Sequence, residues 1–173
     1  MNLRSTPEAM DRFLDQKNQD LFLKFGVFSL AEMQSRHDIL LENYSKTINI
    51  EALTMIDMAR KDILPAITTY IKELSDTAVS ISNAAGVDAV YEKNLIGKLV
   101  KLQAAISGKI DILENAIVSV KEISDISKQS YAYRDSVFLA MQDLRAAVDK
   151  AESLCATKYW PYPSYGELLF GVR

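Results

Sequence analysis

The sequence predicts an all-α fold: an up-down bundle of three long antiparallel helices, with short N-terminal lead-in helices and an extended aromatic C-terminal tail. Three observations predict it. Only six Gly and four Pro interrupt the 173 residues, so long helices are favoured over many short strands with turns. Apolar residues recur every three or four positions over long stretches, which is the helical period. Hydrophobic residues make up 49% and charged residues 25% of the chain, the balance of a globular protein.

Residues 1–28 are predicted to form the lead-in. Ser5 precedes Pro7 and Glu8, which places a capping hydroxyl before a proline and an acid in the first turn of a helix. A short helix should therefore begin near Pro7. Phenylalanines and leucines follow in a polar background up to Gly26, a residue that favours the left-handed end of a helix. These short helices need another surface to pack against.

Residues 29–157 are predicted to form the bundle, and its first helix has clear boundaries. Ser29 and Glu32 match a Ser-x-x-Glu capping box, and the helical pattern then runs to Gly86. Pro65 removes one backbone donor and crowds the preceding turn, so we expect a kink or a break there. The later apolar positions of this segment share one face, namely Ala59, Ile63, Ile67, Tyr70, Leu74, Ala78 and Ile81.

Two further helices complete the predicted bundle. The short connection 86–88 should reverse the chain, with Asp88 as a cap for the next helix. The apolar seam of the second helix is Leu95, Leu99, Leu102, Ile106, Ile110, Leu113, Ile117 and Val120. After a polar stretch over 124–130, the third seam is Tyr133, Val137, Met141, Leu144, Val148, Ala151 and Cys155. The core should form between Leu99, Leu102, Ile106, Leu113 and Ile117 on one side and Ile63, Ile67, Leu74, Val137, Leu144 and Val148 on the other.

Residues 158–173 differ from the helical body. Two prolines in the run Tyr-Trp-Pro-Tyr-Pro, 159–163, bias their predecessors to extended backbone, so the tail should be an extended strap. Aromatic side chains beside prolines offer large contact area at a small entropic cost. The candidate docking residues are Trp160, Tyr162, Tyr165 and Phe170. These residues either pack against the chain's own bundle or dock onto another domain or subunit. We treat 1–173 as a single helical domain.

Charge and composition exclude several classes of partner. The net charge is −3 and basic and acidic residues are interspersed, so the chain has no electrostatic footprint for nucleic acid. Charges interrupt every apolar run, which excludes a membrane span. The single cysteine, Cys155, cannot form an internal disulfide, and the N-terminus lacks an apolar signal segment. These features favour a cytoplasmic location.

Few residues could carry chemistry. One His and one Cys are too few for the common metal or nucleophile sites. We expect His37 to be an ordinary surface or interface imidazole and Cys155 to be a small buried hydrophobe. No Glu-x-x-His motif supports a carboxylate metal site, and Asp62 is the one carboxylate to inspect. No glycine-rich phosphate loop is present either. The sequence therefore predicts no catalytic, cofactor-binding or metal-binding residue in this chain.

Several strings resemble one known family. They are Phe-Gly-Val-Phe-Ser at 25–29, the run at 46–55 that contains Thr-Ile-Asn-Ile-Glu-Ala, Asp-Ile-Leu-Pro-Ala at 62–66, Tyr-Arg-Asp at 133–135, Met141, and Tyr-Trp-Pro-Tyr-Pro at 159–163 through Leu-Leu-Phe at 168–170. Over nearly its whole length the chain resembles the C-terminal helical region of type III glutamine synthetases. The run at 46–55 and the aromatic tail are the most specific parts of the likeness.

The resemblance implies a parent enzyme of nitrogen metabolism, a ligase that makes glutamine from glutamate, ammonia and ATP with Mg or Mn ions in a ring-based oligomer. The family's metal ligands, ATP-binding strands and substrate arginines belong to a preceding catalytic domain, so no catalytic residue is transferred to this chain. Whether the chain alone is an enzyme stays open. Its implied partners are the catalytic domain and neighbouring subunits, and its implied role is oligomer assembly or regulation.

Two other functions remain compatible with the sequence. One is a free-standing helical adaptor or coiled-coil protein whose groove binds a partner helix. The other is a helical-bundle enzyme with a carboxylate metal site.

Overall fold

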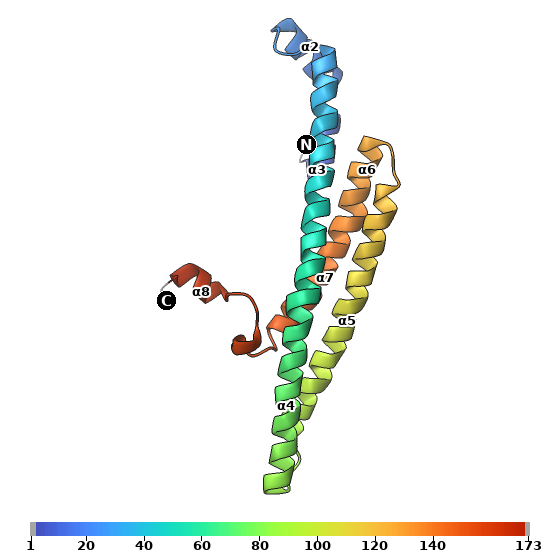
Figure 1. Ribbon diagram of the computed structural model, residues 1–173. Coiled ribbons are helices and arrows are strands. Elements are labelled where there is room, and N and C mark those ends of the chain that lie inside the picture. The colour runs from blue at the N-terminus through green and yellow to red at the C-terminus, as the bar shows by residue number, and fades with distance from the viewer. Residues whose placement is uncertain (1–2, 172–173) are drawn as a thin grey trace. The chain divides into compact units, whose positions relative to one another are not determined.

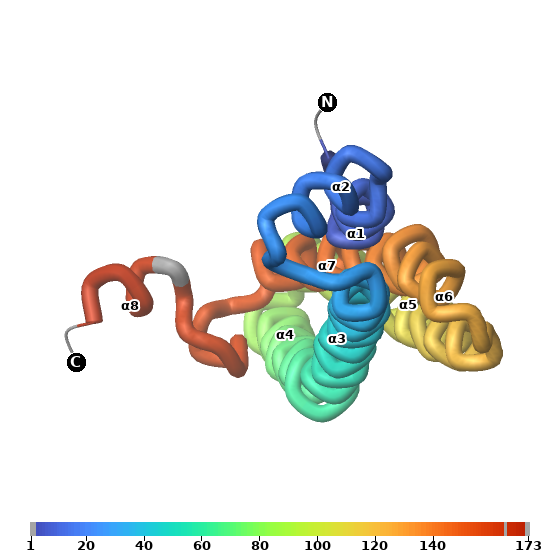
Figure 2. Tube along the Cα trace, turned by 90° about the horizontal axis from the view of Figure 1, so that it is seen from above, coloured from blue at the N-terminus to red at the C-terminus, as the bar shows by residue number. Residues whose placement is uncertain are grey.

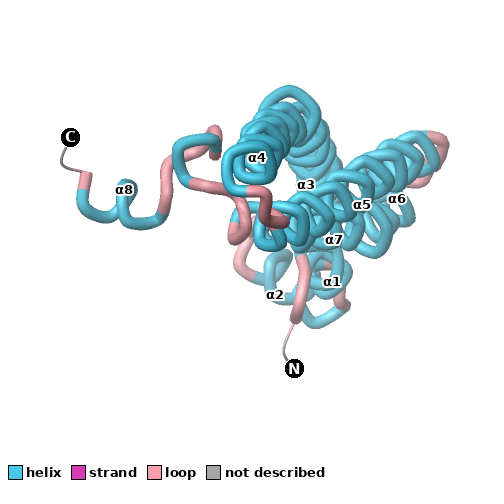
Figure 3. Tube along the Cα trace, turned by 90° about the horizontal axis from the view of Figure 1, so that it is seen from below, coloured by secondary structure: helices cyan, strands magenta, loops and turns pink. Residues whose placement is uncertain are grey.

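A computed structural model describes residues 3–171, and every regular element within that range is helical (Figure 3). The all-α fold class is therefore confirmed. The described elements are α1 (Thr6–Phe13), α2 (Gln16–Lys24), α3 (Leu30–Met58), η1 (Ala59–Ile63), α4 (Leu64–Ala85), α5 (Val90–Lys121), α6 (Ile126–Ala132), η2 (Tyr133–Val137), α7 (Phe138–Glu152), η3 (Thr157–Tyr159) and α8 (Tyr165–Phe170). Among these helices, none combines the length and the apolar character that crossing a bilayer requires.

The chain divides into two compact units. The first contains the residues up to Leu53 together with Leu113–Met141, and the second contains Thr54–Ile112 together with the residues from Gln142 on. Each unit has its own buried residues and is described separately. The assignment of 1–173 to a single domain stays a prediction.

In the first unit, the lead-in forms two short helices that lie beside each other (Figure 2). The helix α1 begins after Ser5, with Pro7 in its first turn as predicted. The ring of Phe13 on α1 lies 5.8 Å from the ring of Phe22 on α2, centroid to centroid. Gly26 has a φ of +62°, the left-handed conformation that a glycine adopts without a Cβ clash. The predicted positions of the start and the stop are both confirmed, but the Ser5 side chain does not cap the first turn as expected.

The capping box that starts α3 is also confirmed. The Ser29 backbone N–H donates to Glu32 Oε2 at 2.7 Å, and the Glu32 N–H donates to Ser29 Oγ at 3.3 Å. These hydrogen bonds satisfy two donors that the first turn of a helix leaves unpaired. Hydrogen bonds from Ser29 also hold the pKa of Glu32 below its ordinary value.

The buried face of α3 includes polar side chains that the sequence pattern did not place in the core. His37 is 8% exposed and lies between Met33 and Leu41 on the same face, because residues four apart stack on one side of a helix. Of the two expected positions for His37, a surface position is therefore wrong, and an interface position stays a prediction. The His37 Nδ1 lies 2.8 Å from Asp38 Oδ1. The buried residues of this unit also include Leu41, Ser45, Ile48, Ala52, Leu113, Ile117, Val120, Ser130, Tyr133, Val137, Ala140 and Met141.

The third long helix starts earlier than its apolar seam. Asp125 caps α6 by accepting from the Lys128 N–H at 2.8 Å, so the helix begins inside the polar stretch that was expected to precede it. The turn η2 is a π-helical turn in which the Phe138 N–H donates to the Tyr133 carbonyl, five residues earlier. An α-helix would place that bond four residues apart. The polar residues 126–130 form the first part of this helix.

In the second unit, the α-helical hydrogen-bond pattern is interrupted just before Pro65, where a kink or a break was expected, while the chain stays helical on both sides. The turn η1 is a π-helical turn, and the Leu64 N–H donates to the Ala59 carbonyl. Pro65 then occupies the first turn of α4, where its missing N–H has no intrahelical partner to lose. A break into two separate helices is therefore not observed, and the π turn accommodates the proline instead.

Gly86 ends α4 with a φ of +64° and donates its N–H to the Ser82 carbonyl. The chain then reverses, and α4 and α5 run side by side in opposite directions (Figure 1). The Gln103 side chain on α5 donates to Thr68 Oγ1 on α4 at 2.6 Å, which joins the two helices. Asp88 offers its backbone carbonyl to the Val90 N–H, while its carboxylate pairs with Lys93 rather than capping α5.

Most of the predicted core residues of the second unit are buried. The buried set comprises Ile56, Ala59, Ile63, Ile67, Leu74, Ala78, Ala89, Leu95, Leu99, Ile106, Ile110, Leu144, Ala147 and Ala151. Leu102 and Val148 are only half-buried, so full burial of these two is not observed. At the end of the third helix, Ala147 and Ala151 occupy the core positions next to Leu144.

The tail is not extended throughout, so the prediction of an extended strap is wrong for Tyr165–Phe170, which form α8. The Ser164 N–H donates to Glu167 Oε2 at 2.7 Å, and the Glu167 N–H donates to Ser164 Oγ at 3.3 Å. This is a second Ser-x-x-Glu capping box, the same signal that marks the start of α3. Between η3 and α8 the prolines do keep the backbone out of a helix.

Candidate functional site

The first part of the tail lies against α4. The rings of Tyr159 and Tyr70 are stacked, with centroids 5.2 Å apart and an interplanar angle of 30°. Lys158 Nζ lies 3.7 Å from Glu73 Oε1 and 4.6 Å from the centroid of the Tyr159 ring. Stacked aromatic pairs contribute about 0.5–1.5 kcal/mol beyond the area that they bury. Tyr159, which was not among the candidate docking residues, therefore makes a principal contact.

A second contact joins the tail to the π turn η1. The Tyr162 hydroxyl donates to Asp62 Oδ2 at 2.7 Å. Burial and this hydrogen bond raise the pKa of Tyr162 to about 12. Asp62, the one carboxylate considered as a possible metal ligand, thus accepts a hydrogen bond from the tail. The structure therefore brings Asp62 and the candidate docking residue Tyr162 together.

The other candidate docking residues have different surroundings. Trp160 is half-buried directly after η3. Phe170 is 75% exposed at the end of α8, beside Leu168 and Leu169, which are also exposed. The side chain of Tyr165 lies outside the part of the structure that is described. Docking through Trp160, Tyr165 and Phe170 stays a prediction.

At the other end of the chain, the lead-in helix α1 is held by side chains of the third helix. The Arg134 guanidinium donates from Nη1 to Glu8 Oε1 at 2.8 Å and to Ser5 Oγ at 3.2 Å. The Tyr131 hydroxyl donates to Asp11 Oδ2 at 2.5 Å. This hydrogen bond, together with burial, raises the pKa of Tyr131 to about 12. Since these partners lie more than a hundred residues apart along the chain, no local spacing in the sequence could have paired them.

The residues considered for chemistry are not gathered into one site. Cys155 is half-buried, and burial raises the pKa of its thiol, which favours the unreactive thiol over the nucleophilic thiolate at neutral pH. Asp57 pairs with Lys61, one turn along the helix. In residues 3–171, no group of three or more His, Cys, Asp or Glu side chains is arranged to hold a metal ion.

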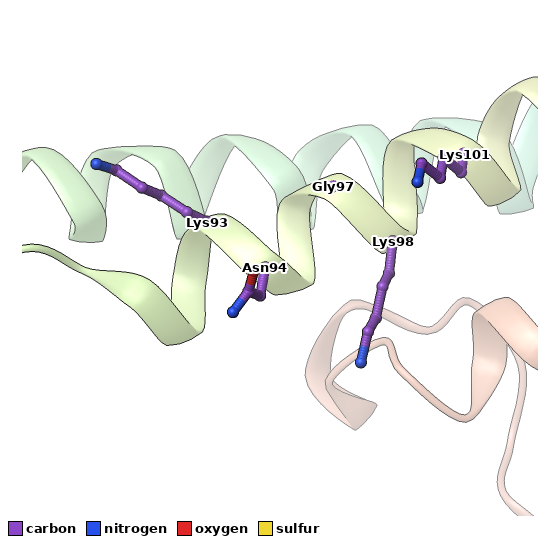
Figure 4. Close-up of a pocket in the computed structure, with 5 residues that line it drawn as sticks. All are labelled: Lys93, Asn94, Gly97, Lys98 and Lys101. Carbon is purple, nitrogen blue, oxygen red and sulfur yellow. The ribbon is translucent and has the colours of Figure 1, made fainter.

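Basic side chains surround one shallow depression on α5, which has a volume of about 380 Å³. It is lined by Lys93, Asn94, Gly97, Lys98 and Lys101 (Figure 4). The lysine side chains point in different directions and do not converge on one point (Figure 4). Lysines on an exposed helix are ordinarily solvated, and the depression does not form a cradle for an anion.

The described structure defines an all-helical chain in which polar and aromatic contacts hold both end segments, within their respective units, against longer helices. The family described as the glutamine synthetase C-terminal domain matches residues 1–82. A glutamine synthetase of Butyrivibrio fibrisolvens is 35% identical over 99% of this chain and 25% of its own length. A type-3 glutamine synthetase of Dictyostelium discoideum is 30% identical over 98% of this chain and 24% of its own length.

The resemblance of this chain to the C-terminal region of glutamine synthetases, a type-3 enzyme among them, is therefore confirmed. A further relative, a glutamine synthetase of Bacteroides fragilis, is 23% identical over 98% of the chain and 24% of its own length. The chain therefore spans about a quarter of the length of the curated relatives that it matches.

Proposed function

We propose that this chain is the non-catalytic C-terminal helical domain of a type III glutamine synthetase and that it supports assembly or regulation of the parent oligomer. The observation that carries the proposal is the coverage: relatives align over 98–99% of this chain, yet it spans only 24–25% of their length. The remaining three quarters of such proteins would bind ATP and Mg or Mn and ligate ammonia to glutamate.

The three long helical segments would then form one up-down bundle in the cytoplasm. Its partners would be the catalytic domain and neighbouring subunits, with no role for nucleic acid or a membrane.

Two observations support a role in contacts between proteins. The tail is held to α4 by Tyr159 and to η1 by Tyr162, and the exposed apolar residues of α8 follow this attached segment. Apolar clusters that remain exposed in this way commonly mark interaction sites.

The experiment that tests this role measures the oligomer distribution of the longer protein by sedimentation velocity. Leu168 is 67% exposed, and Leu168→Asp should shift the distribution towards smaller species because a carboxylate is costly to bury in an apolar contact. Ile112 is 61% exposed on α5, so Ile112→Asp is a matched control that should leave the distribution unchanged. An unchanged distribution for Leu168→Asp would remove the tail from the assembly contacts.

A chain encoded with its own start and no catalytic region upstream would favour the free-standing adaptor.

A further inference from the structure

Few buried side chains hold the lead-in segment in place. In α1 only Pro7 is buried, and α2 has no buried residue among those described. Burial of apolar area is usually the main source of packing free energy. A helix that buries so little needs additional contacts to keep one position against the rest of its unit. The contacts with the third helix therefore carry much of the attachment of α1.

The guanidinium of Arg134 is the centre of these contacts. Its Nη1 donates to Glu8 and Ser5 on the α1 side. Its Nε and Nη2 donate to the two carboxylate oxygens of Asp135 at 2.7 and 3.0 Å, and the guanidinium carbon lies 4.6 Å from the centroid of the Tyr131 ring. Only the planar fork of an arginine can form the paired bonds to one carboxylate while it also reaches a second.

The start of α1 is built around this arginine. Ser5 is the residue that precedes the helix, but its side chain does not cap the first turn; its hydroxyl oxygen accepts from Arg134 instead. One oxygen of Glu8 accepts the Arg4 backbone N–H at 2.9 Å, and the other accepts from Arg134. The same carboxylate thus completes the beginning of α1 and attaches that helix to the third one.

The π turn η2 lets neighbouring residues contact two different helices. Tyr133 is buried and its hydroxyl donates to Asn49 Oδ1 on α3 at 3.3 Å. The next residue, Arg134, contacts α1. A π turn inserts one residue into the helical repeat, and such insertions are frequent at functional sites. Here the turn presents one side chain to the unit's core and the next to the lead-in helix.

We infer that Arg134, oriented by Asp135 and backed by Tyr131, is a positioning residue that latches α1 onto the third helix and so fixes the position of the lead-in helix within this unit. The latch consists of Ser5, Glu8 and Asp11 on the α1 side and Tyr131, Arg134 and Asp135 on the other. Opening the latch should free α1 while α3 and the buried part of the third helix keep their structure. The inference uses contacts within this chain and does not depend on the proposed function.

Amide hydrogen exchange of the 173-residue chain, followed by mass spectrometry, tests the latch. Arg134→Met keeps the aliphatic stem and removes every hydrogen bond of the guanidinium, and it should raise exchange over 6–13 by about tenfold or more, because such bonds to charged groups are among the strongest in proteins. Exchange over 39–52 on α3 should stay unchanged. Arg134→Lys keeps the charge without the fork and should give an intermediate increase. Arg145 pairs with Asp149 on the exposed side of α7, so Arg145→Met is the matched control and should leave exchange over 6–13 unchanged.

A double variant separates the latch from general support of the fold. Glu8→Gln with Arg134→Met should raise exchange of α1 no further than Arg134→Met does alone, because both changes remove the same contact. The inference is overturned if Arg134→Met leaves exchange over 6–13 unchanged, or if exchange rises equally over 6–13 and 39–52. Should Arg134→Met fail to fold, Tyr131→Phe and Glu8→Gln retain the arginine. Each must then raise exchange in α1 selectively, and absence of that rise would equally overturn the inference.

Discussion

Ile106 is fully buried on α5, whereas Ile112 in the same helix is 61% exposed. Truncation of a buried aliphatic side chain removes its transfer free energy and leaves a cavity. We therefore expect Ile106→Ala to lower the free energy of unfolding by about 2–5 kcal/mol. Ile112→Ala, the same chemical change at the surface, should lower it by less than about 0.5 kcal/mol. Urea denaturation of the two variants checks this, and equal effects would show that the seam of α5 is assigned wrongly.

The raised pKa of Tyr162 predicts that the free energy of unfolding depends on pH in the alkaline range. The pKa of Tyr162 is raised from 10.0 to about 12 in the folded chain, so its protonated form is stabilised by folding. That contribution is complete below pH 10 and is lost as the pH rises from 10 to about 12. Tyr162→Phe should therefore show a shallower loss of stability over this interval than the parent chain. A slope for Tyr162→Phe identical to that of the parent chain would contradict the assignment.

At the scale of elements, both interruptions of the long helices are π turns, but only one has a visible cause in the sequence. Pro65 cannot donate the usual backbone hydrogen bond, and η1 changes the hydrogen-bond pattern just before it. No proline or glycine marks η2, whose residues instead contact α1 and α3. The reversal predicted at Gly86 and the stop predicted at Gly26 depend only on the local backbone conformation, and the structure confirms both.

The tail contains two elements that truncation can separate. Removal of all residues after Lys158 deletes the Tyr159 stack and the Tyr162 hydrogen bond, a loss of about 2 kcal/mol. For a chain of this size that corresponds to a decrease in Tm of about 4–8 °C. Truncation after Ser164 removes α8 and keeps both contacts, so its Tm should remain close to that of the parent. Thermal unfolding followed by circular dichroism checks both, and equal decreases would assign the stabilising contact to α8.

At the scale of the whole molecule, we expect the 173-residue chain alone to have no glutamine synthetase activity. It contains neither a glycine-rich phosphate loop nor a Glu-x-x-His motif, and it spans about a quarter of its relatives. Purified chain supplied with glutamate, ammonia, ATP and Mg or Mn should form no glutamine, whereas the longer protein, assayed in parallel, should. Turnover that remains constant per milligram of chain through further purification would show that the chain is itself a catalyst.

The sequence by itself determined the helical class, the capping box at Ser29, the irregularity near Pro65 and most of the buried seam, because each depends on residues within a few turns of one another. The same local rule could have found α8, since Ser164 and Glu167 repeat the signal of Ser29 and Glu32. Short strings such as 159–163 also carry the resemblance to the family, because each is local in the sequence.

Only the tertiary structure decided which distant side chains meet. The hydrogen bonds from Arg134 to Glu8, from Tyr131 to Asp11 and from Tyr162 to Asp62 each join residues that lie at least a hundred positions apart in the chain. His37 is buried because the face of α3 that carries Met33 and Leu41 is covered, which helical spacing permits but does not require. Hydrogen bonds between side chains depend on positions within a few tenths of an ångström, and those positions exist only once the helices have packed.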